Sequence, residues 1–105
     1  MATTAERLTR IHEQIDAAAA AVDADDGASP VLSAVVQEMA RKAEKSRGAL
    51  PGADDAALRM TIVEVEQAAD SAKAAVEADP GPSEATRQAV LDAHLAICIL
   101  KGKTA

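Results

Sequence analysis

Two stretches of the chain are near copies of each other, and this repeat is what most limits the folds open to it. The segment AAVDADDGASP at 20–30 returns as AAVEADPGPSE at 74–84. The likeness extends in both directions without a gap, so that Gly48 falls on Gly102. Self-similarity at a fixed period is typical of one structural unit used twice. We predict a first repeat over 3–48, a linker over 48–54 and a second repeat over 55–102.

Each repeat holds two segments in which apolar residues recur every three or four positions, which is the spacing of one helix face. Helix-capping residues precede these segments. Thr3 with Glu6 matches a capping box, and Ser29 stands before Pro30, which suits the first helical position. The predicted helices span 4–24, 30–47, 55–79 and 84–102, and the glycines at 48 and 102 are interpreted as stop signals.

The absence of aromatic residues narrows how these helices can pack. The chain has no Phe, Trp or Tyr, so its core must come from aliphatic side chains, with Ala at the closest contacts. Such a composition favours helices over strands. Each of the four helices has an apolar stripe, and in this chain the stripes can be buried only against one another. We therefore predict an all-α fold with a single domain over 1–105, an antiparallel four-helix bundle made of two tandem repeated helical hairpins.

The charges divide between the two ends of such a bundle. Both hairpin turns lie at one end, where acidic residues gather, and basic residues gather at the other end. The net charge of −6 and the lack of aromatic stacking platforms argue against nucleic acid as a partner. The predicted acidic pole consists of Asp23, Asp25, Asp26, Glu77 and Asp79.

Cysteine content and hydropathy bear on the compartment. Cys98 is the single cysteine of the sequence, so no intrachain disulfide can form, and a reducing compartment fits best. No apolar run approaches the roughly 20 residues that span a bilayer. We expect a cytoplasmic protein with no membrane association.

No catalytic or cofactor motif is evident. DADDG at 23–27 resembles the start of a calcium loop, but its glycine comes one place early and Ala34 stands where the bidentate Glu should be. No histidine and acid are placed to activate a serine or cysteine nucleophile. We therefore expect no cofactor, and an enzyme is the less favoured interpretation.

Two histidines supply the alternative functions. His94 and Cys98 are one helical turn apart and could offer a metal two ligands, although a zinc site needs more, such as an acidic side chain. A metal or small-ligand binding protein is thus the first alternative, with no metal site assigned. The second alternative is phosphotransfer through His12, which stands beside Glu13. Transfer needs an exposed ring, and we expect His12 at the surface.

The last predicted helix is apolar on more than one face. A peripheral bundle helix normally has a polar outer side, so extra apolar residues indicate either burial or contact with another chain. We favour a non-catalytic interaction or regulatory module that self-associates or binds a protein partner through this helix. The residues of the predicted interaction surface are Leu91, Leu95, Cys98 and Ile99.

Overall fold

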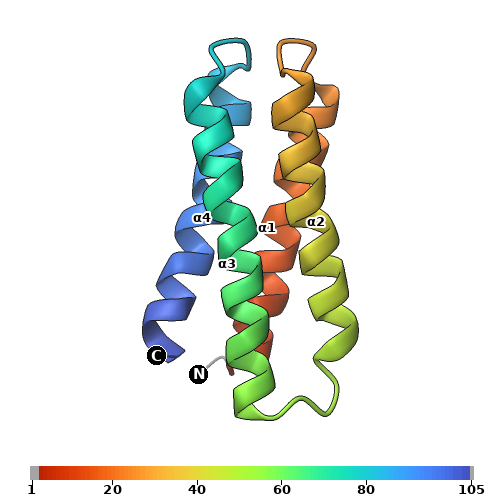
Figure 1. Ribbon diagram of the computed structural model, residues 1–105, viewed down its shortest axis with the longest axis vertical. Coiled ribbons are helices and arrows are strands. Elements are labelled where there is room, and N and C mark those ends of the chain that lie inside the picture. Colours follow the sequence, from red (N-terminus) through yellow and green to blue (C-terminus); the bar gives the residue numbers. More distant parts are fainter. Residues whose placement is uncertain (1–2, 105) are drawn as a thin grey trace.

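The computed structural model describes residues 3–104, which form four helices and no strands (Figure 1). The helices are α1 (Thr4–Ala24), α2 (Pro30–Ala49), α3 (Asp55–Ala78) and α4 (Glu84–Thr104). They run up, down, up and down in a bundle of 40 × 22 × 20 Å. Both hairpin turns lie at one end, and the start of α1 and the end of α4 lie at the other with the α2–α3 linker. The predicted four-helix bundle is confirmed, and none of the described helices is long and apolar enough to cross a bilayer.

Every helix begins at a capping side chain that the sequence predicts. The first turn of a helix has unpaired N–H groups, and a polar side chain just before it satisfies one of them. Thr3 and Glu6 form the predicted capping box. The four cap bonds are Glu6 N to Thr3 Oγ1 (3.1 Å), Leu32 N to Ser29 Oγ (3.1 Å), Ala57 N to Asp54 Oδ1 (2.8 Å) and Thr86 N to Ser83 Oγ (3.3 Å).

Two predicted stop signals are wrong. α2 continues through Gly48 to Ala49, and α4 continues through Gly102 to Thr104. A glycine ends a helix by adopting a positive φ, and neither of these does so. The chain instead turns at 50–53, where the Ala53 N–H donates to the Leu50 carbonyl (3.1 Å) and Gly52 takes a φ of 79°.

The core is the set of apolar stripes that the periodicity predicts. Each helix packs on two neighbours, with α4 returning to contact α1, so all four stripes meet along the axis. Leu58, the first residue of the predicted α3 stripe, is only half-buried, because it lies in the first turns of α3, next to the α2–α3 linker. The buried stripe residues are Leu8, Ile11, Ile15, Ala18, Val22, Leu32, Val36, Met39, Ala43, Ile62, Val65, Ala69, Ala72, Val76, Thr86, Val90, Ala93, Ile97 and Leu100.

The two hairpin turns interlock through reciprocal hydrogen bonds. The Asp25 carboxylate accepts from the Gly27 N–H of its own turn (2.9 Å) and from the Ser83 N–H of the other turn (2.9 Å). The same pattern is repeated from the second turn. Asp79 accepts from the N–H groups of Gly81 (3.0 Å) and Ser29 (2.8 Å).

Glycine is required where the turns touch. A Cβ on Gly27 would overlap the carbonyl oxygen of Gly81, and a Cβ on Gly81 would overlap the carbonyl oxygen of Gly27. Backbone lies on both sides of the contact, so no flexible side chain can move aside. The spacing between the hairpins at this end is therefore set by main-chain contact.

Replacing glycine by alanine should destabilise the protein at position 27 and stabilise it at position 48. Gly27→Ala pushes the turns apart, and we expect a loss of more than about 1 kcal/mol in the free energy of unfolding. Gly48→Ala adds a methyl to open space inside a helix, and we expect a gain of up to about 0.5–1 kcal/mol. Urea unfolding followed by circular dichroism measures both. Equal stability of the Gly27→Ala protein and the wild type would show that the turns need not touch.

Acid should weaken the turn interlock. The Ser83 N–H, the Thr86 side chain and the Gly27 N–H lower the pKa of Asp25 to about 2 from 3.8. Between these two values the unfolded chain binds a proton that the native chain does not, so stability present above about pH 4 is lost as the pH falls toward 2. In urea unfolding at pH 5 and pH 2.5, Asp25→Asn should show a smaller acid loss than the wild type. An equal loss in both proteins would contradict this account of Asp25.

Candidate functional site

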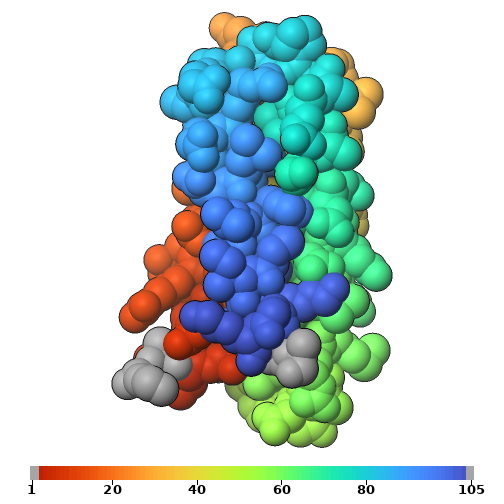
Figure 2. Space-filling model, turned by 90° about the vertical axis from the view of Figure 1, so that its left-hand side faces the viewer, coloured from red at the N-terminus to blue at the C-terminus, as the bar shows by residue number. Residues whose placement is uncertain are grey.

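The outer face of α4 carries two exposed aliphatic side chains. Leu95 is 56% exposed and Ile99 is 50% exposed, and they lie one helical turn apart. Figure 2 shows α4 as a continuous ridge between α1 and α3. The other two residues of the predicted surface lie differently, because Leu91 packs partly against the core and the Cys98 sulfur faces His94. The apolar patch of α4 is thus Leu95 with Ile99.

The exposed residues of α4 change character along the helix. Asp92 and Glu84 are exposed toward the turn end, while Lys103 is exposed toward the terminal end. The apolar patch of Leu95 and Ile99 lies between these two charged stretches. This face therefore runs from acidic through apolar to basic.

A shallow groove borders the apolar patch on its α1 side. Its floor is apolar and three basic side chains surround it, so an apolar or acidic partner group is favoured there. The lining residues are Arg7, Arg10, Ile11, Ala96, Ile99, Leu100 and Lys103. Other exposed apolar side chains of the described chain are Val31 on α2 and Met60 and Val63 on α3.

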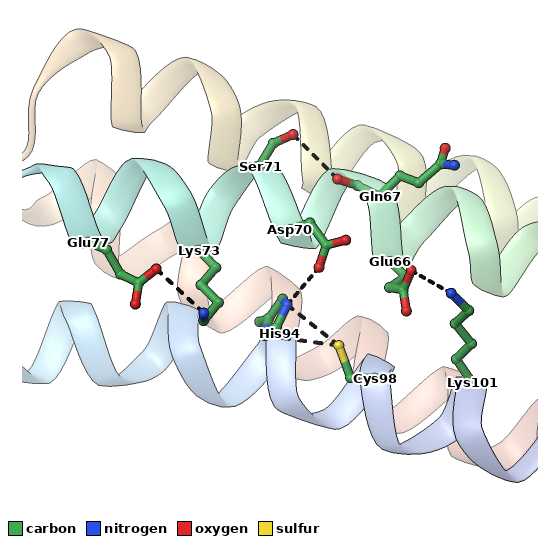
Figure 3. A network of polar contacts seen from close by, with 9 residues as sticks. All are labelled: Glu66, Gln67, Asp70, Ser71, Lys73, Glu77, His94, Cys98 and Lys101. Carbon is green, nitrogen blue, oxygen red and sulfur yellow. Dashed lines mark hydrogen bonds and ion pairs between the residues drawn. The ribbon is translucent and has the colours of Figure 1, made fainter.

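A polar network follows the contact between α3 and α4 (Figure 3). His94 Nε2 lies 2.7 Å from Asp70 Oδ1 across the two helices, and Cys98 Sγ lies 3.5 Å from the same nitrogen. The candidate ligand atoms of these three residues all lie within 4.8 Å of one another. One turn further on, Lys101 Nζ donates to Glu66 Oε1 at 2.9 Å.

The prediction that no histidine and acid lie beside a cysteine is wrong, because His94 and Asp70 do, but the electrostatics around Cys98 do not suit a nucleophile. Burial raises the pKa of the Cys98 thiol, and the carboxylates of Glu66 and Asp70 raise it further. Lys101 and Lys73 act in the opposite direction with smaller effect. The thiol is therefore protonated at neutral pH, and the reactive thiolate form is scarce.

The acidic pole lies around the two turns, and most of its carboxylates have defined partners. Asp25 and Asp79 accept the N–H groups of the interlocked turns, which hold their pKa values below the usual range. Asp23 accepts from Gln37 Nε2 at 2.7 Å. Glu77 pairs with Lys73 at 3.5 Å, and Asp26 is exposed. The carboxylates of Asp25 and Asp79 thus stabilise the two turns, in addition to any role of the acidic pole in binding a partner.

The prediction that His12 lies at the surface is wrong. Its side chain is fully buried (0% exposed), because His12 lies four residues after Leu8 and three before Ile15, on the buried face of α1. A phosphoryl donor has no access to a ring in this position. The structure therefore removes the ground for phosphotransfer through His12.

The hydrogen bonds of Ser46 assign the state of the buried ring. Ser46 Oγ donates its single proton to the Ala43 carbonyl (2.8 Å), so it accepts from the Nε2–H of His12 (2.6 Å). Nδ1 is then an unprotonated acceptor, and it has no partner among the described residues. His12 is a neutral core residue.

Comparison with known proteins does not place the chain in a family. Neither protein families nor curated proteins nor solved structures gave a significant match to the chain.

Sequence reasoning missed two partners that the fold supplies, Asp70 for His94 and Ser46 for His12. A signal for Asp70 existed in the hairpin itself. Residues of an antiparallel hairpin face each other when they are about equally far from its turn, and Asp70 and His94 are nearly so with respect to Gly81. Ser46 had a signal as well, since it follows Ala43 by three residues and so continues the three-to-four spacing of the buried α2 stripe.

His12 should make stability depend on pH near neutrality. Burial lowers its pKa, the Arg47 charge lowers it further, and Asp16 and Glu44 act in the opposite direction. Below about pH 6.5 the unfolded chain binds a proton that the buried ring does not, so stability falls as the pH decreases. Leucine cannot be protonated, so the free energy of unfolding of His12→Leu should decrease less between pH 7 and pH 5 than that of the wild type.

Urea unfolding of the wild type and His12→Leu at pH 7, 6 and 5 measures the difference. Leucine fits the buried site and leaves Ser46 bonded to the Ala43 carbonyl. Parallel pH profiles for the two proteins would contradict the assignment of His12 as a neutral buried group.

Proposed function

We propose that the protein is a non-catalytic interaction or regulatory module that self-associates through α4. The observation that carries this proposal is the exposure of Leu95 and Ile99, at 56% and 50%, on the outer face of one helix. Neighbouring exposed aliphatic side chains on a small domain are typical of an interaction site. The proposed location is the cytoplasm, where a single unpaired cysteine stays reduced.

A second copy of the chain is the proposed partner, because the face of α4 complements itself. In a two-fold dimer, residue i of one copy meets residue j of the other, and j meets i. If two α4 helices pack antiparallel with the axis between Leu95 and Ile99, Leu95 of each copy faces Ile99 of the other. The apolar patch is then covered on both chains.

The charges of α4 favour the same arrangement. Asp92 lies on the turn side of the patch and Lys103 on its terminal side. Antiparallel packing brings Asp92 of one copy near Lys103 of the other, with Arg10 of the bordering groove close by. Parallel packing would instead place like charges together. Opposite charges across an interface fix its register more than they add affinity.

The expected dimer is weak, because only two large aliphatic side chains per copy are exposed in the patch. Such interfaces lie at the low end of the size range for specific contacts. A concentration-dependent monomer–dimer equilibrium would suit a regulatory module, since its occupancy changes with the amount of protein present.

Leu95→Glu should weaken the dimer at least about tenfold, which corresponds to about 1.4 kcal/mol. The reason is that a carboxylate would lose its hydration inside an apolar contact. Sedimentation equilibrium over a range of concentrations measures the association constant, and circular dichroism checks that helicity is kept. Val31→Glu is the matched control, since Val31 is 67% exposed on α2, outside the proposed interface.

A charge exchange tests the antiparallel register within the same experiment. Asp92→Lys and Lys103→Asp should each weaken the dimer, and the double variant should recover much of the loss. A wild type that stays monomeric at all concentrations would overturn the proposal. So would a Leu95→Glu protein that associates as strongly as the Val31→Glu control.

A further inference from the structure

We propose that Asp70, His94 and Cys98 form a zinc site with three protein ligands and an open fourth position. The site lies between α3 and α4 (Figure 3). It adjoins the apolar patch of α4, because His94 directly precedes Leu95 and Cys98 directly precedes Ile99. It would give the protein a metal-binding capacity that does not depend on self-association.

Two of the three distances between ligand atoms already approach those of a tetrahedral site. Zinc bonds of about 2.0 Å to nitrogen and oxygen and about 2.3 Å to sulfur place N and S about 3.5 Å apart, and N and O about 3.3 Å apart. His94 Nε2 and Cys98 Sγ are separated by 3.5 Å, and His94 Nε2 and Asp70 Oδ1 by 2.7 Å. The second distance must widen by about 0.6 Å. Asp70 is exposed and free to rotate by that amount.

The ligand set favours zinc over other common ions. One thiolate, one imidazole and one carboxylate are donor types that zinc accepts, and the Cys98 thiol would release its proton to solvent when the ion binds. Calcium and magnesium require oxygen donors throughout, whereas copper(I) prefers sulfur donors over a carboxylate. With three ligands from the chain, the fourth position would be open to water or an exchangeable ligand.

The scaffold holds two of the ligands and leaves the third accessible. His94 and Cys98 are one turn apart on the same helix face, and the His94 side chain is only 17% exposed. Asp70 reaches them from the neighbouring helix. The nearest further charges are Glu66, which favours a cation, and Lys101 and Lys73, which oppose it. Glu66 is itself paired with Lys101.

The first hairpin supplies a matched control that lacks the site. Asp16 is the repeat counterpart of Asp70, and the counterparts of His94 and Cys98 are Ala40 and Glu44. Asp16 pairs with Arg47 at 3.2 Å. Asp16→Asn therefore removes an equivalent carboxylate from the bundle without removing a proposed ligand.

Calorimetric titration of the untagged, reduced chain with zinc chloride tests the proposal. The wild type should bind one zinc ion per chain. Asp70→Asn, His94→Gln and Cys98→Ser should each weaken binding at least about tenfold, since losing only an outer-shell partner already costs 10–100-fold. Asp16→Asn and Leu95→Glu should bind as the wild type does, the latter because the site does not need the dimer.

Cobalt(II) gives a second measurement that a structural role of these residues would not affect. A cobalt–thiolate charge-transfer band should appear in the wild type and be absent from Cys98→Ser. Circular dichroism checks the fold of each variant. If His94→Gln unfolds, Asp70→Asn and Cys98→Ser still test the proposal, because Asp70 is exposed and serine differs little in size from cysteine. The proposal is overturned if the wild type binds no zinc, or if Asp70→Asn and Cys98→Ser bind zinc as tightly as Asp16→Asn.

Discussion

Two aspartates that reach across from one hairpin turn to the other fix the register of the two hairpins against each other. Asp25 accepts the N–H of Ser83, and Asp79 accepts the N–H of Ser29, so each turn is tied to the other. The turns also meet backbone to backbone at Gly27 and Gly81, where a side chain would not fit. With one end held in this way, the hairpins cannot slide along each other without breaking charge-assisted hydrogen bonds.

The features with functional interest lie in the second hairpin, which this interlock joins to the first. Within that hairpin α3 packs against α4 so that Asp70 meets His94, while Leu95 and Ile99 stay exposed. The candidate zinc site and the apolar patch therefore use different sides of one helix. The acidic residues near the turns have a structural explanation in part, because the carboxylates of Asp25 and Asp79 are engaged by backbone N–H groups.

The fold was largely predictable from local signals, while the polar contacts were not. Capping residues such as Thr3 and Ser29 and the three-to-four spacing of apolar residues act within a helix or at its ends, so they can be interpreted without knowing the packing. The position of His12 was wrongly predicted because its polar side chain suggested exposure, although it lies four residues after Leu8 and three before Ile15 on the buried face of α1. The internal duplication stays an interpretation of the sequence, to which the structure adds that both turns make the same hydrogen bonds.

The bundle of four helices, the start of each helix and the aliphatic side chains of the core were all predictable from the amino-acid sequence. These properties depend on residues at most a few turns apart, whose relative positions the helix geometry sets. Three features required the folded structure: the contact of buried His12 with Ser46, the approach of Asp70 to His94 and Cys98, and the exposure of Leu95. Those contacts depend on how far each helix is rotated and shifted against its neighbours, and packing alone fixes both.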